Sequence, residues 1–203
     1  MAMPNQNDIH QLAVALGPGG YDAAARLQDS VANGNVAIGS SPVSTVVAKE
    51  FQDKLWTQTV LTVTNLDIST TDDGANGSFG GTKIYDMPAG ALWVLARTNL
   101  TATVAAGIGA TATLKHSVGT VVAATNDTLD STKADIIAST NTTLSGSAGA
   151  VKGLTATPLI IDGTSSAVDV YLNFGVADAG ATANSTVTVS GTITLLRQTI
   201  ATS

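Results

Sequence analysis

The segment from Ser185 to Arg197 (STVTVSGTITLLR) alternates almost without interruption between small polar and apolar side chains. Successive side chains of a β-strand point to opposite faces of the sheet, so the pattern predicts one long strand with an apolar face and a hydroxyl-bearing face. A soluble enzyme more often carries charge on the outer face of such a strand. We interpret the hydroxyl face as typical of a building block in an assembly rather than of a catalyst.

The rest of the composition supports this interpretation. Charged residues make up 12% of the chain, against about 25% in an ordinary soluble domain. A surface so poor in charge is unusual for a dispersed monomer, and we expect much of it to be covered by neighbours. The net charge of −6 and the scattered basic residues argue against a nucleic-acid partner. No apolar stretch is long enough to span a bilayer and no signal peptide is recognisable, so we expect no membrane partner.

The chain divides near residue 55. Residues 1–54 have dispersed apolar residues and frequent turn signals such as Gly17-Pro18-Gly19-Gly20. They are predicted to form an extended N-terminal arm with one short helix at about residues 22–31, which ends at Asn33-Gly34. Such an arm packs on the body or on a neighbouring subunit, and a floppy terminus is the alternative that composition leaves open.

Residues 55–203 are predicted to form one all-β domain, an antiparallel β-sandwich or jelly roll with one short helix over Asp130–Ala138. Thr111–Ser117 and Thr120–Ala124 are interpreted as a pair of strands that turns at Val118-Gly119. The clean alternation favours antiparallel strands over a buried parallel sheet. The other predicted strands are Trp56–Asn65, Thr82–Asp86, Leu92–Val104, Leu159–Ile161, Val168–Val176 and Ser185–Arg197.

Residues suited to catalysis are few, and we predict that the protein is not an enzyme and holds no cofactor or metal. The only histidines are His10 and His116. His116 shares a strand face with apolar residues, which indicates a structural role. The loop Asp72-x-Gly74-x-Asn76-Gly77 begins like a calcium loop, but Lys83 stands where an EF-hand needs Glu. An irregular calcium site remains an alternative to a simple turn there.

Three aromatic residues, Trp56, Trp93 and Tyr171, are candidates for an interaction surface, together with Asp72, Asp73 and Asn76 of the turn-rich loop. Aromatic side chains contribute much of the buried area in cores and at subunit contacts, so packing is the favoured interpretation of the three rings. A sugar-binding surface is the alternative.

Residues 60 to 196 resemble small β-rich structural proteins of tailed bacteriophages. The segments that carry the resemblance are Asn76–Gly80, Lys83–Gly90, Leu129–Ile137, Asp162–Thr164, Asp169–Asn173 and Asp178–Gly191. The resemblance implies a capsid decoration or cement protein, commonly a homotrimer, that binds the major capsid protein. Its expected location is the outer capsid surface of the virion, after assembly in the host cytoplasm. The alternative is a tail or head-fibre component that binds a receptor or glycan on the host surface.

Overall fold

A computed structural model of the chain describes residues 39–53, 56–154, 159–163 and 166–200. The predicted helix at about residues 22–31 and most of the predicted arm lie outside the described residues. The last part of that arm, residues 46–53, forms a strand that pairs with the body.

Ten strands make up almost all of the regular secondary structure in the described residues, and every strand pairing is antiparallel. The strands are β1 (Val46–Asp53), β2 (Trp56–Asp72), β3 (Ser78–Met87), β4 (Gly90–Val104), β5 (Thr113–Gly119), β6 (Ile137–Thr143), β7 (Ala148–Leu154), β8 (Leu159–Gly163), β9 (Val168–Val176) and β10 (Ser185–Ile200). Three short 3-10 turns accompany them: η1 (Gly74–Asn76), η2 (Ser131–Lys133) and η3 (Asp178–Gly180). The predicted all-β fold is confirmed.

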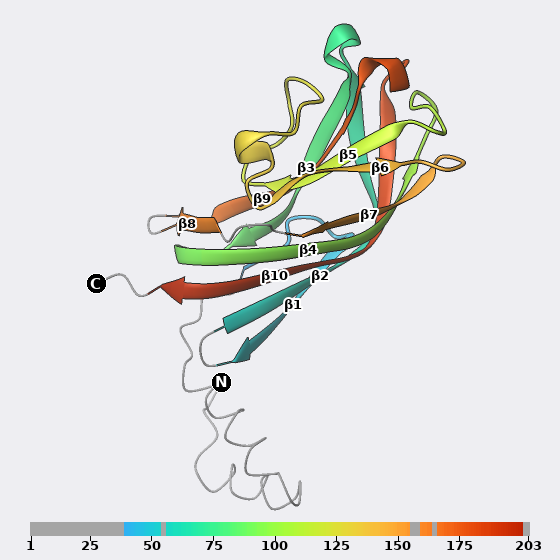
Figure 1. The fold of residues 1–203 in the computed structure, drawn as a ribbon. Coiled ribbons are helices and arrows are strands. Elements are labelled where there is room, and N and C mark those ends of the chain that lie inside the picture. The colour runs from blue at the N-terminus through green and yellow to red at the C-terminus, as the bar shows by residue number, and fades with distance from the viewer. Residues whose placement is uncertain (1–38, 54–55, 155–158, 164–165, 201–203) are drawn as a thin grey trace, which may run out of the picture.

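The strands form one sheet with the order β6-β5-β9-β3-β2-β10-β4-β7, to which β1 adds beside β2 and β8 beside β4. The sheet folds over itself into two layers, with β6, β5, β9 and β3 in one and the remaining strands in the other (Figure 1). A turn at Gly146 and Ser147, both with positive φ, joins β6 to β7, the two ends of the sheet. Positive φ angles at both central residues are those of a type I′ turn, which β-hairpins prefer. Because this turn connects the strands at the two ends of the sheet, the sheet is nearly closed.

The apolar core fills the space between the layers. Val187, Val189, Ile193 and Leu195 of β10 are all fully buried, as their alternation predicts. A bulge interrupts the alternation where Asn65 of β2 adopts a positive φ of 47°. The backbone N–H of Asn65 donates to Ser190 Oγ over 2.9 Å, so the bulge is held by a side chain of β10. Beyond it the inward positions of β2 change from odd to even residue numbers.

Two predictions about residues 111–138 are wrong. The helix expected over Asp130–Ala138 is reduced to the single turn η2, and Ile137 opens β6 opposite Val118 of β5. Thr120–Ala124 is no strand, because β5 pairs with β6 and β9 instead of with the residues that follow it. In both cases a partner strand distant in sequence outweighs the local preference, which is a weak determinant of structure.

Candidate interaction surface

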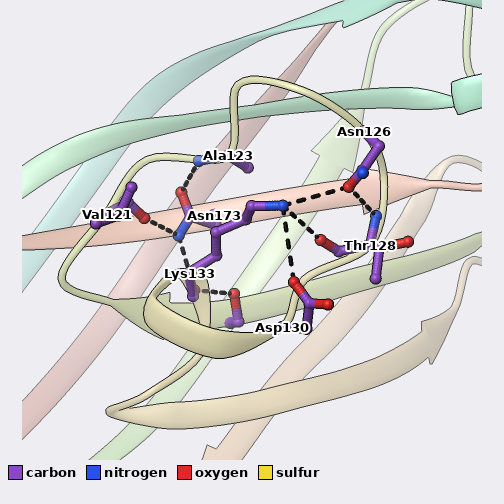
Figure 2. A network of polar contacts seen from close by, with 8 residues as sticks. Val121, Ala123, Asn126, Thr128, Asp130, Lys133 and Asn173 are labelled. Carbon is purple, nitrogen blue, oxygen red and sulfur yellow. Dashed lines mark hydrogen bonds and ion pairs between the residues drawn. The ribbon is translucent and has the colours of Figure 1, made fainter.

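The two outer faces of the sandwich differ, because a long excursion covers one of them. Residues 120–136, between β5 and β6, lie over the outer side of β9, where Asn173 holds them in place (Figure 2). Asn173 Oδ1 accepts from the backbone N–H of Ala123 over 2.9 Å. Its Nδ2 donates to the carbonyl oxygens of Val121 and Lys133 over 3.0 and 2.9 Å. One buried amide therefore satisfies three backbone groups of the excursion.

Charged side chains and a close approach fasten the rest of the excursion. Lys133 Nζ donates to Asn126 Oδ1 and to the carbonyl oxygen of Thr128, and Figure 2 shows this side chain spanning the loop. Lys115 Nζ of β5 forms an ion pair with Asp127 Oδ2 at 2.6 Å. A Cβ on Gly175 would lie 2.6 Å from the carbonyl oxygen of Asp127, so only glycine lets the loop lie this close to β9. The covered face is thus built from residues of the chain itself.

The opposite outer face, formed by β1, β2, β10, β4 and β7, has no such cover among the described residues. We call it the bare face. It is defined by the outward side chains that share three registers across these strands: Val47, Lys49, Phe51, Gln58, Val60, Thr62, Thr192, Thr194, Leu196, Leu95, Arg97, Asn99, Lys152 and Leu154. Val47, Phe51 and Leu154 expose 53, 58 and 69% of their surface, and they are three of the four large apolar residues exposed in the described structure. Val47 and Phe51 lie on β1 and Leu154 on β7, the two edge strands of this face, so the exposed apolar groups share one side of the molecule.

The charged side chains of these three registers are all basic, and the exposed carboxylate of Asp67 lies further along β2 on the same outward side. The described structure includes seven basic side chains, and Lys83, Lys115, Lys133 and Arg197 each form an ion pair with an acidic residue. The other three, Lys49, Arg97 and Lys152, form no ion pair with a described residue, and all three belong to the bare face. The set contains no acidic residue, although the chain as a whole carries a net charge of −6.

The interior side of the same layer is held by the only glutamate of the chain. Glu50 of β1 accepts through Oε2 from Arg197 Nη2 of β10 at 3.0 Å. Its Oε1 accepts from the hydroxyl of Tyr85 and, over 3.3 Å, from that of Thr59. Burial, with the Glu50 carboxylate beside the phenol, raises the pKa of Tyr85 to about 12. This cluster ties β1, the strand that carries Val47 and Phe51, to the body.

The sequence-predicted candidates do not gather in one place. Trp56 is half-buried at the start of β2, where it pairs with Asp53 beside the bare face, and the backbone of Trp93 pairs with Gln198 of β10. Tyr171 belongs to β9, in the other layer. Its hydroxyl donates to Asp169 Oδ2 over 2.9 Å. The ammonium group of Lys83, which bonds Asp169, holds the pKa of that carboxyl below its usual range.

The acidic loop lies at the far end of β2 from Trp56. Asn76 Nδ2 donates to Asp73 Oδ2 over 2.8 Å, and the backbone N–H of Asp72 donates to Asn184 Oδ1 over 2.8 Å. These contacts fasten the loop to itself and to the segment before β10. No group of three or more His, Asp or Glu residues that could hold a metal ion occurs among the described residues.

His116 of β5 is fully buried between the layers, with its Nε2 3.3 Å from Thr98 Oγ1 of β4. Burial lowers its pKa to about 4, against a smaller opposing effect of the Thr140 backbone. The ring contacts the facing layer and lies away from both outer faces. Within the described ranges, no helix is long and apolar enough to cross a membrane.

From the sequence, neither Phe51 nor the three cations Lys49, Arg97 and Lys152 was singled out. One signal was available for β1, because Val47, Lys49 and Phe51 stand at alternate positions, as the outward residues of a strand do. Whether Lys49, Arg97 and Lys152 meet an acidic side chain among the described residues depends on which strands are neighbours. That information is not contained in the local pattern.

No protein-family model and no curated protein matches the chain. Among solved structures, the enzymatically active domain of tailspike protein 4 of bacteriophage CBA120 is 15% identical with a TM-score of 0.26, covering 78% of this chain and 19% of that one. The arabinose-bound α-L-arabinofuranosidase MgGH51 is 10% identical with a TM-score of 0.25, covering 78% of this chain and 23% of that one. The chain spans less than a quarter of either structure, and one of these weak neighbours is a phage protein.

Proposed function

We propose that the protein is a structural component of a bacteriophage virion, of the capsid decoration or cement type, and that the bare face is the surface that docks on the capsid. The supporting observation is the contrast between the two outer faces. One is closed by an excursion that Asn173 fastens, and the other presents exposed apolar and cationic side chains without a cover in the described structure. In this role the protein binds and does not catalyse.

The chemistry of the bare face suits attachment to an ordered shell. Its Thr hydroxyls and its three exposed apolar residues can be buried with a small desolvation penalty, and its cations attract an acidic surface. A protein that binds the assembled shell better than its separated subunits shifts the equilibrium toward the shell. The proposed partners are the major capsid protein and two further copies of the chain, as a homotrimer on the outer capsid surface.

The test uses capsids of the encoding phage that lack this protein, mixed with the purified full chain and sedimented. We expect binding at a fixed stoichiometry and a higher melting temperature of the decorated shells. Phe51→Thr and Arg97→Ala should each weaken binding about tenfold, which corresponds to about 1.4 kcal/mol.

Two matched control variants change the other side of the molecule. Val121→Thr removes the fourth exposed apolar side chain, and Ala124→Glu lowers the net charge by one, as Arg97→Ala does. Both controls should bind like the natural chain. Labelled antibody that decorates only the tail of intact virions would refute the capsid role and support the alternative, a tail or head-fibre component that binds the host.

A further inference from the structure

We propose that in the free protein the bare face is covered by the chain's own residues 1–38. This inference goes beyond the docking role, because it names the occupant of the face before any shell is present. It is tested on the purified chain alone. If the protein failed to bind capsids, the proposed cover of the bare face by residues 1–38 would still stand. If residues 1–38 did not cover the bare face, the proposed docking on the capsid would still stand.

Charge complementarity is the first argument. The bare face offers Lys49, Arg97 and Lys152, which form no ion pair with a described residue. Residues 1–38 contain three Asp and one Arg, a side-chain charge of −2. A second copy placed face to face would instead set three cations against three cations, and like charges at an interface oppose binding.

Apolar complementarity is the second argument. Val47, Phe51 and Leu154 expose more than half of their surface to water. In residues 1–38, apolar side chains such as Ile9, Leu12 and Leu27 stand within a few positions of the three Asp residues. A segment of this kind can bury its apolar groups against the exposed ones while its carboxylates meet the cations.

The point where the described chain begins is the third argument. The backbone N–H of Gly39 donates to Glu50 Oε1 over 3.3 Å and Ser40 pairs with Asp86 of β3, so the described chain begins on the inward side of β1, the edge strand of the bare face. A chain of 38 residues reaches up to about 125 Å when extended, and its root-mean-square span as a coil is roughly 35 Å. Five strands at their usual spacing span only about 24 Å. The tether also raises the effective concentration to the millimolar range, so modest contacts suffice.

The experiment places a photo-crosslinking phenylalanine analogue at position 51, and separately at position 154, of the full chain at micromolar concentration. After irradiation, we expect products of single-chain mass in which mass spectrometry maps the crosslink to residues 1–38. The same analogue at position 121, an exposed site on the covered side, should give at most a tenth of that yield. Products of two-chain mass would overturn the proposal in favour of a second copy. Crosslinks absent from residues 1–38 would overturn it as well.

A charge exchange separates specific contact from random encounter. Lys49→Glu with Arg97→Glu should lower the crosslinking yield at position 154 at least fivefold, and adding Asp22→Lys with Asp29→Lys should restore it. The circular dichroism spectra of the variants should match that of the natural chain, since all described positions changed here are exposed. An unchanged yield in the first pair would contradict the electrostatic basis of the proposal.

Discussion

Arg197 Nη2 donates to Glu50 Oε2 at 3.0 Å, and this ion pair joins β10, the last strand in the sequence, to β1, the first. Arg197 is 1% exposed, and Glu50 keeps 13% of its side chain accessible. The two strands lie on either side of β2 and do not pair with each other. The pair therefore fastens β1 to the body independently of the sheet hydrogen bonds.

Replacing Glu50 with Gln should lower the free energy of unfolding by about 3 kcal/mol, because it removes the negative charge that faces the buried guanidinium of Arg197. For a chain of this size, the melting temperature should fall by roughly 6–12 °C. Thermal unfolding followed by circular dichroism measures the change. Asp67→Asn is the matched control, since that exposed carboxylate accepts a hydrogen bond from the Thr188 hydroxyl at the surface, and it should shift the melting temperature by less than about 2 °C.

The phenol of Tyr85 should ionise late. Its pKa is raised from 10.0 to about 12, so the folded protein favours the neutral form. The resulting stabilisation is complete below pH 10 and is lost as the pH rises through 12. We expect the denaturant concentration at the midpoint of unfolding to decrease as the pH is raised from 10 to 12. In the Tyr85→Phe variant this decrease should be smaller. An equal decrease of the midpoint with pH in the natural chain and in the Tyr85→Phe variant would contradict the raised pKa of Tyr85.

Acid should destabilise the fold through His116. Its pKa is lowered from 6.5 to about 4, so the neutral ring is favoured in the folded state. The stabilisation is present above pH 6.5 and is lost as the pH falls to 4, and the shift corresponds to about 3 kcal/mol. His116→Gln cannot titrate there and should lose less stability between pH 7 and 4 than the natural chain in urea unfolding. NMR titration of the ring should give a midpoint near pH 4, and a midpoint near 6.5 would refute the prediction.

The excursion over β9 should loosen when Asn173 changes to Asp. The substitution keeps the shape but replaces the amide donor with an oxygen that faces the carbonyl groups of Val121 and Lys133. We expect a loss of at least about 2 kcal/mol in stability and faster hydrogen exchange over residues 120–136. Asn99→Asp, at an exposed position of the bare face, should change neither. Unchanged exchange in the Asn173 variant would show that other contacts hold the loop.

Alternation predicted the strands with the clearest patterns. Val168–Val176 has the same bounds as β9, and Ser185–Arg197 differs from β10 only at its end. The failures lie where a local signal competed with distant partners. Asp135 falls within the predicted helix Asp130–Ala138, yet its carboxylate accepts from the backbone N–H and the hydroxyl of Thr120, just after β5.

The candidate surface was less predictable than the strands. The aromatic residues chosen from the sequence are divided between the two layers, with Trp56 in β2 and Tyr171 in β9. The exposure of Phe51 depends on the fact that no described segment covers β1. Which residues are exposed in this way depends on the path of the chain between strands. The alternation of side chains within one strand contains no information about that path.

The sequence by itself determined the strand class, the inward and outward sides of strands with clear alternation such as β10, and the scarcity of charged residues, because these follow from the alternation and from composition. Tertiary structure decided which outer face is covered. Asn173 and Gly175 receive the 120–136 excursion on one side, while Lys49, Arg97 and Lys152 on the other form no ion pair with a described residue. The physical reason is that hydrogen bonds and ion pairs form between residues brought together by non-local strand pairing, which local sequence patterns do not specify.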